Sequence, residues 1–151
     1  MARFTHPAIT STGGSELGTW SIEGGTIGDG AVQPTFSSDP IFLGHYILVG
    51  SLCHFTIEVD MDNITSFGSG QYYMKLPFSS HHAVLLSDGC LHDISGDDQY
   101  AILGHVDAGS DIMKLFSIGS NGRHLPFEYG VPINLNAADN FHIAGTFEID
   151  A

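Results

Sequence analysis

The sequence has few basic residues and little charge of either sign. Four of its 151 residues are Lys or Arg and 17 are Asp or Glu, which gives a formal net charge of −13 at pH 7. Four scattered cations cannot neutralise a run of phosphates, so the composition excludes nucleic acid as a partner. The same negative field opposes attachment to an anionic membrane surface. The acidity favours solubility and a neutral or basic partner.

Long apolar runs and helical periodicity are also missing. No apolar run approaches the roughly 20 residues that a transmembrane helix requires, so we expect no membrane insertion. Residues 1–7 contain no apolar stretch of the kind that a secretory signal needs. No window has the period of an amphipathic helix, and no repeat recurs at a solenoid period.

The common enzyme and metal-site motifs are absent as well. The sequence has no Gly-x-Ser-x-Gly elbow and no His-x-His, His-Glu-x-x-His or Cys-x-x-Cys spacing. His54, His105 and His142 lie on the polar sides of alternating runs, where a cross-strand pair would hold zinc if two of them met. The carboxylates around Asp60 and Asp97 do not fit a calcium loop. We therefore predict a non-enzymatic protein with no catalytic, cofactor or metal site, and leave open whether a histidine or aspartate binds an ion.

Cysteine is scarce, with Cys53 and Cys90 the two examples. We expect both to be reduced, buried, small apolar residues. A disulfide between neighbouring strands is the alternative, and the sequence leaves open whether the two cysteines pair. Their spacing does not suggest a metal site.

The clearest local signal is an alternating run over residues 52–61. A period of two predicts a strand with one face buried and the other in water. A second alternating run covers 71–78 and ends near Pro77, and a glycine-rich turn over 62–70 separates the two runs. We therefore expect the two runs to form an antiparallel hairpin. The apolar side of the first run is made of Cys53, Phe55, Ile57, Val59 and Met61.

Further strands are expected along the rest of the chain. The apolar run 83–86 predicts a strand buried on both faces that ends at 87–89, and 90–94 predicts another short strand. Alternation predicts strands over 99–106 and 141–149. Strands every 8–12 residues or so, separated by turns, are typical of sandwiches and barrels.

The composition agrees with this pattern. The 19 glycines, the 14% share of charged residues and the 42% share of hydrophobic residues suit many short strands around a packed core. The length fits one domain. The sequence therefore predicts an all-β fold, a single antiparallel, jelly-roll-like β-sandwich over residues 18–151, preceded by an extended N-terminal arm over 1–17.

Several short motifs follow one another in a recognisable order: Gly18, Thr19 and Trp20, then Gly24, Gly25 and Thr26, then Gly44, Tyr46, Val49 and Gly50, then Leu76, Pro77 and Phe78. A looser match continues through 89–91 and 144–148. This order resembles the β-sandwich domain at the C-terminal ends of tailed-bacteriophage tail fibres and in related virion surface proteins. The resemblance implies a homotrimer on the particle surface, made in the host cytoplasm.

Within this class the sequence favours one location. Because a tail fibre needs a long shaft and an attachment domain, we expect instead a capsid decoration subunit of the cement or head-fibre type. Its partners would be further copies of itself and the major capsid protein or another virion protein. The alternatives are a tail-fibre tip or receptor-binding module, and a carbohydrate-binding module.

Tyrosines are the candidate residues for a glycan-binding surface, because an aromatic face stacks on sugars while neighbouring polar groups form hydrogen bonds. The candidates for contact with a host surface glycan are Tyr46, Tyr73 and Tyr129. The alternative is that these side chains pack at the rim of the domain while Tyr72 and Tyr100 face the core. For Trp20 we expect a half-buried packing role.

Overall fold

The computed structural model describes residues 15–39 and 41–150, which form twelve strands and no helix. No helix in this part of the chain is long and apolar enough to cross a membrane. The strands are β1 (Ser15–Trp20), β2 (Gly24–Val32), β3 (Thr35–Phe36), β4 (Ile41–Val49), β5 (Leu52–Asp60), β6 (Ile64–Ser66), β7 (Ser69–Lys75), β8 (Val84–Asp93), β9 (Asp98–Val106), β10 (Ile112–Ile118), β11 (His124–Pro126) and β12 (Asn140–Glu148).

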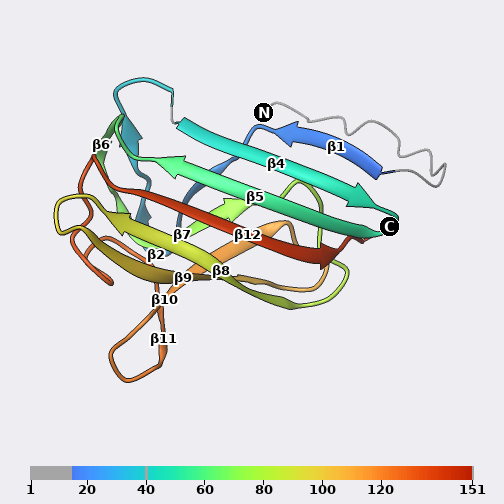
Figure 1. The fold of residues 1–151 in the computed structure, drawn as a ribbon. Helices are drawn as coiled ribbons and strands as arrows, with labels where there is room; N and C mark the ends of the chain where they lie inside the picture. Colours follow the sequence, from blue (N-terminus) through green and yellow to red (C-terminus); the bar gives the residue numbers. More distant parts are fainter. Residues whose placement is uncertain (1–14, 40, 151) are drawn as a thin grey trace.

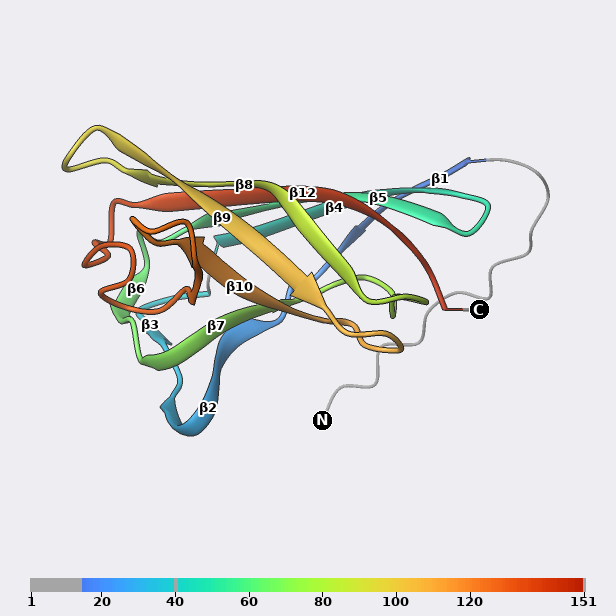
Figure 2. The same ribbon diagram turned by 90° about the horizontal axis from the view of Figure 1, so that it is seen from below.

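Ten of the strands form one antiparallel sheet in the order β1-β4-β5-β12-β8-β9-β10-β7-β2, with β11 paired to β10. The sheet curls on itself, so that β1, β4, β5 and β12 lie in one layer and β10, β7 and β2 lie beneath them (Figures 1 and 2). The short strands β3 and β6 pair separately. The predicted antiparallel, sandwich-like, all-β fold is confirmed, with both layers supplied by a single sheet.

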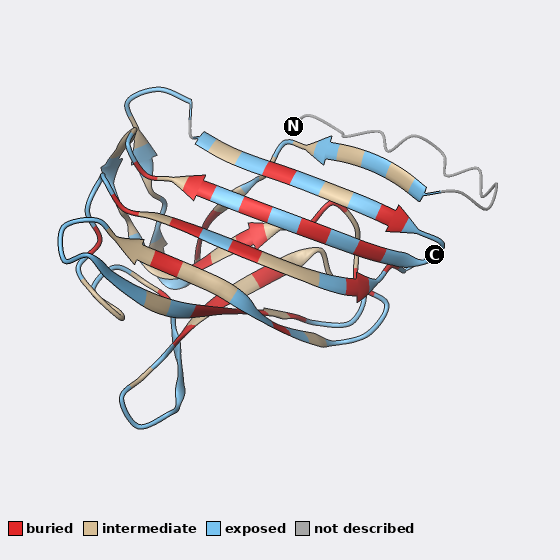
Figure 3. Ribbon diagram, in the orientation of Figure 1, coloured by how far each residue is buried: buried red, intermediate tan, exposed pale blue. Residues whose placement is uncertain are grey.

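The hydrophobic core lies between the two layers. All five residues on the apolar side of the run 52–61 are at most 5% exposed, as predicted. The predicted inward side of the last strand is also buried at Phe141, Ile143 and Phe147. Figure 3 shows the resulting alternation of buried and exposed positions along β5 and β12. β5 keeps the period of two along its whole length because it pairs without a break with β4 on one side and β12 on the other.

The predicted hairpin between the two alternating runs is wrong. β5 forms its hairpin with β4, through a two-residue loop in which Gly50 adopts a φ of 61°. β7 lies between β2 and β10 in the other layer. Residues 62–70 therefore cross between the layers and carry β6 on the way. Alternation shows which side of a strand is buried but not which strand lies beside it, so two strands that face each other across the core look like a hairpin.

The predicted strand break at residues 87–89 is also wrong. β8 is continuous, and its pairing with β9 shifts register between Leu86 and Gly89. A Cβ atom at Gly89 would lie 2.5 Å from the carbonyl oxygen of Ile102, so glycine permits the close approach of the two backbones at this irregularity. Leu85 is 52% exposed, so the strand is not buried on both faces.

The N-terminal arm is described only at its end. Residues 15–17, which the sequence assigned to the arm, belong to β1. Residues 1–14 lie outside the described part of the chain. β1 pairs with β4 over its full length, and the register sets Gly18 opposite Tyr46 and Trp20 opposite Gly44. The ring of Tyr46 occupies the space above Gly18, and the ring of Trp20 occupies the space above Gly44.

Phe127 anchors the segment that follows β11. Its side chain is fully buried and meets the rings of Tyr72 and Phe141 edge-on, with centroid distances of 5.2 and 5.7 Å. Its backbone N–H donates to the carbonyl of Leu115, and its own carbonyl accepts from the N–H of Tyr72. One residue thus joins both layers of the core.

Asp139 holds together the loops at one end of the molecule. Its carboxylate is fully buried and accepts hydrogen bonds from the backbone N–H groups of Ile94, at 3.1 Å, and Asn136, at 2.7 Å. Its carbonyl accepts a bond from the N–H of Met61. The residue therefore links the end of β8, the loop before β12 and the end of β5.

Candidate interaction surface

The strand β4 is apolar on both faces. Its inward side contributes the buried Leu48 and the half-buried Phe42 and Tyr46 to the core. Its outward side carries apolar residues that are exposed in the described structure. Together with one residue from each neighbouring strand they form a surface that we call the apolar stripe: Leu17, Ile41, Leu43, Ile47, Val49 and Leu52.

The pairing register joins Leu17, Ile47, Val49 and Leu52 into one patch, while His45, which pairs with Thr19 and Thr56, separates this patch from Ile41 and Leu43. Ile47 lies opposite Leu17 of β1, and Val49 lies opposite Leu52 of β5. Directly opposed residues on one face of a sheet are in contact, so these pairs extend the apolar surface across three strands. The stripe ends at the outward side of β5, where the exposed residues are His54, Thr56 and Glu58. It holds six of the twelve exposed large hydrophobic side chains of the described residues.

Two carboxylates border one end of the stripe, because Glu58 and Asp60 of β5 pair in register with Leu43 and Ile41. The outward residues of β1 and β4 are apolar, hydroxyl-bearing or histidine. The nearest carboxylate on these two strands, Glu16, lies on the opposite side, where it accepts a 3.1 Å hydrogen bond from the hydroxyl of Tyr46. A shallow open groove crosses the middle of the same outward surface, between Leu17, His45 and His54. The six side chains of the stripe carry no charge, but carboxylates lie beside it at Ile41, Leu43 and Leu52.

The two edges of the large sheet differ. β1 pairs with β4 in unbroken register, and no described strand pairs with its outer edge. The pairing of β2 with β7 is irregular between Ile27 and Val32. At β2 the side-chain amide of Gln33 accepts from the N–H of Thr26, at 3.0 Å, and donates to its carbonyl, at 2.6 Å. At Thr26 the side chain of Gln33 therefore takes the place of a neighbouring strand, while the β1 edge remains regular.

The three candidate tyrosines lie in different parts of the molecule. The ring of Tyr46 is half-buried between Trp20 and Phe78, with centroid distances of 6.3 and 5.1 Å, and burial followed by Glu16 raises its pKa. Tyr73 is half-buried on the outward side of β7, opposite Lys114 in the register. Tyr129 follows β11 and is 50% exposed. The structure does not bring the three together.

Tyr129 presents the most exposed aromatic ring of the three. It stacks on Phe67 with a centroid distance of 5.5 Å and an interplanar angle of 20°. Trp20 has the expected packing role, since it is half-buried and donates from Nε1 to the carbonyl of Lys75 at 3.0 Å. The alternative positions for Tyr72 and Tyr100 also agree with the structure: Tyr72 is 9% exposed, and Tyr100 packs against the core.

Both cysteines are free thiols in the structure, with Cys53 buried and Cys90 half-buried. Burial raises the pKa of the Cys53 thiol to about 12, so it stays protonated and unreactive near neutral pH. The geometry gives Cys53 a packing role in the core.

The candidate metal-binding histidines lie beside other polar groups. His54 shares a 2.7 Å hydrogen bond with Thr146, and His105 lies 3.8 Å from Asp107. His142 lies opposite Glu58 in the register. Within residues 15–39 and 41–150, no three His, Cys, Asp or Glu side chains gather closely enough to hold a metal ion.

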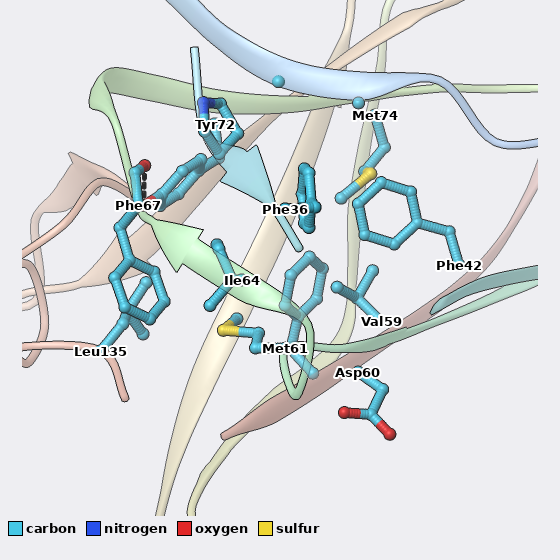
Figure 4. A pocket seen from close by; sticks show the side chains of 14 residues that line it. Phe36, Phe42, Val59, Asp60, Met61, Ile64, Phe67, Tyr72, Met74 and Leu135 are labelled. Carbon is cyan, nitrogen blue, oxygen red and sulfur yellow. Dashed lines mark hydrogen bonds between the residues drawn. The ribbon is translucent and has the colours of Figure 1, made fainter. Parts of the chain in front are cut away.

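An apolar cavity of about 40 Å³ lies between the layers at one end of the core. Phe36, Phe42, Met61 and Tyr72 are among the residues that line it, and Figure 4 shows the carboxylate of Asp60 pointing away from it. A space of this size holds a few water molecules at most, and its lining offers them few polar partners. We interpret it as a packing void.

The sequence matches no protein-family model and no curated protein. Among solved structures, the crystal structure of Dettilon tailspike protein (gp208) matches with a TM-score of 0.61 and 17% sequence identity. The match covers 90% of this chain and 24% of the tailspike chain. The fold is similar to part of a tailspike. At this level of identity the similarity establishes the fold alone, because one fold serves many functions.

The apolar stripe was missed by the sequence reasoning, although a signal for it exists. Residues 41–43 and 46–49 are almost continuously apolar, and a strand of that kind is apolar on both faces. The sequence does not show whether the second face is covered by the chain itself, since that depends on where β4 lies in the sheet.

Proposed function

We propose that the chain is a non-enzymatic structural module of a tailed-bacteriophage virion, which binds copies of itself and a larger assembly. The observation that carries the proposal is the apolar stripe beside the regular β1 edge. Exposed apolar surface that is contiguous rather than scattered marks a site of protein association. The order of sequence motifs and the similarity to part of a tailspike both support a place on a phage particle.

The tailspike similarity favours a module of the tail over a capsid decoration subunit. A tail-fibre tip or receptor-binding module therefore becomes the first location to test, and decoration of the capsid becomes the second. On the capsid, a module that binds only the assembled lattice would stabilise the shell by mass action. The small apolar cavity supports association through an outer surface over chemistry in an enclosed site.

Light scattering on the purified chain, together with mass spectrometry of intact particles, tests this proposal. We expect a homotrimer in solution and a protein that is present in every particle. A small copy number would place it in the tail, and a copy number close to that of the major capsid protein would place it on the capsid. A monomer at micromolar concentration, or a particle without the protein, would contradict the proposal.

A second candidate function, glycan binding, is favoured by the exposed ring of Tyr129. The ring is backed by Phe67, which fixes its orientation, and polar side chains such as Glu128 and Asn134 lie nearby in the sequence. A rigid aromatic face of this kind suits stacking on a sugar ring.

For this second candidate we expect binding on a glycan array that Tyr129→Ala reduces by at least about tenfold, since one stacked ring contributes on the order of 1.4 kcal/mol or more. Leu125→Ala, which removes an exposed apolar side chain from the preceding strand, serves as the control and should bind normally. An array without any bound glycan would rule the second candidate out.

A further inference from the structure

We propose that the outer edge of β1 binds an extended segment of another protein of the assembly, which joins the sheet as a further strand. The segment carries apolar side chains on one side and Lys or Arg on the other. This inference rests on the attachment to a larger assembly in the proposed function, and it adds the surface and the chemistry of the partner.

The backbone of β1 is the first argument. All six residues of β1 pair with β4 in unbroken register, and no described strand pairs with the outer edge. Strands at the edge of a sheet are commonly protected by Lys, by Pro or by a β-bulge, and β1 has none of these. Regular edges of this kind bind extended peptides through main-chain hydrogen bonds. At the other edge of the sheet, the side chain of Gln33 already bonds to both backbone groups of Thr26.

The apolar patch beside the edge is the second argument. Leu17 of β1 is 75% exposed, which is the highest exposed fraction among the large hydrophobic side chains of the described residues. It lies opposite Ile47, and Val49 and Leu52 belong to the same patch. A strand added outside β1 would place one side chain about 5 Å from that of Leu17. An apolar residue at that position covers Leu17 and extends the patch to a fourth strand.

Charge determines the chemistry of the partner's other side. Glu16 is the only charged residue of β1, and its half-buried carboxylate accepts a hydrogen bond from the hydroxyl of Tyr46 on the side opposite to Leu17. None of the ion pairs formed within the described residues includes Glu16. A Lys or Arg beside Glu16 would supply the missing positive charge, and the net charge of −13 attracts a basic segment. A second copy of the chain would instead bring another Glu16 and the same negative charge to the contact.

The outward face of β4 is a poorer surface for a partner than the β1 edge. A polar row crosses the middle of this face, where His45 pairs with Thr19 and Thr56. Two carboxylates, Glu58 and Asp60, border one end. A helix lying along β4 would have to cover the polar row. A strand added at β1 contacts β1 and the patch beside it, so the polar row stays in water.

Three synthetic peptides test the inference against the full chain. The first alternates Val and Lys over about eight residues, and the second alternates Val and Glu. The third has the charge of the first but carries Pro in place of two Val, so it cannot pair along its length. By fluorescence polarisation at about 0.15 M salt, we expect one Val-Lys peptide to bind to each chain and the other two peptides to bind at least about tenfold more weakly. Bound Val-Lys peptide should slow hydrogen exchange in Ser15–Trp20 and leave Gly24–Val32 unchanged.

Substitution of Leu17 separates strand addition from simple charge attraction. Leu17→Glu adds a negative charge, so charge attraction alone predicts tighter binding of the Val-Lys peptide. Strand addition predicts binding that is weaker by about tenfold, because the apolar contact beside Leu17 is lost. The control, Val32→Glu, makes the same charge change on the other edge strand at a position that is 59% exposed, and it should leave binding unchanged. Both side chains are exposed, so both variants should keep the circular dichroism spectrum of the unmodified chain.

The outcomes of these measurements are distinct. Binding of the Val-Lys peptide that slows exchange in β1, and that Leu17→Glu weakens but Val32→Glu does not, would support the inference. It would be overturned by the absence of binding, by equal binding of the proline-containing peptide, or by equal effects of the two variants. Slow exchange at every N–H group of β1 in the free chain would also overturn it, because the edge would then be covered by the chain itself or by a second copy. Each of these negative results leaves the proposed function standing, since that depends on the trimeric state and on the presence of the protein in intact particles.

Discussion

Replacement of Phe127 by alanine is expected to lower the free energy of unfolding by about 4 kcal/mol. The ring is fully buried and packs edge-on against Tyr72 and Phe141, which belong to opposite layers of the curled sheet. Its loss would leave a large cavity between the layers. The surrounding strands cannot close that cavity easily, because the backbone of Phe127 is itself bonded to Leu115 and Tyr72.

Chemical denaturation followed by intrinsic fluorescence or circular dichroism would measure this change. Tyr129→Ala is the matched control, because it removes an aromatic ring two positions away that is 50% exposed. We expect the control to cost less than about 1.5 kcal/mol, mainly through loss of stacking on Phe67. Equal losses from the two variants would show that the core does not depend on Phe127 as described.

Replacement of Asp139 by alanine is expected to lower the free energy of unfolding by about 3 kcal/mol. The carboxylate is fully buried and accepts backbone hydrogen bonds from Ile94 and Asn136, so its removal leaves both N–H groups without their partner. The loss should be local, loosening the end of β8 and the loop before β12, since the bond from Met61 goes to the backbone carbonyl of Asp139 and is retained.

The control for this second change is Asp29→Ala, which removes an exposed carboxylate from the irregular part of β2. We expect that variant to stay within about 0.5 kcal/mol of the unmodified chain. Hydrogen exchange would locate the effect of Asp139→Ala through faster exchange at the N–H groups of Ile94 and Asn136. Unchanged exchange at both groups would contradict the role assigned to the carboxylate.

The sequence was a good guide to which side of each strand is buried. The faces of 52–61 and 141–149 follow directly from a period of two, because each strand exposes one side to the core and the other to water. It was a poor guide to which strands are neighbours. Pairing partners depend on the path of the connections, and residues 62–70 cross between layers where a hairpin turn was expected.

Irregular strands are the second feature that the sequence pattern predicts poorly. The sequence Ser87-Asp88-Gly89 has the composition of a turn, and a bulge within a continuous strand uses the same residue types. Asp139 gave no signal at all, since an aspartate in a predicted loop is normally exposed. Its role depends on loops from three distant parts of the chain meeting around one carboxylate.

Only part of the candidate surface can be predicted from the sequence. Residue type alone points to the tyrosines, and the fold separates them: Tyr46 lies at the margin of the core, Tyr73 on β7 and Tyr129 beside Phe67. The stripe depends on position in the sheet, because the outward side of β4 would be covered if another layer lay above it. Sequence patterns describe side chains along one strand, whereas a binding surface combines several strands.

The side-chain amide of Gln33 has a consequence for the size of any assembly. A fibril built by adding sheets margin to margin needs two open margins on every copy, one to accept the previous copy and one to receive the next. In the described part of this chain Gln33 occupies the outward backbone groups of Thr26 on the β2 margin, which opposes the addition of another strand there. Gln33 thereby opposes amyloid-like growth through the β2 margin.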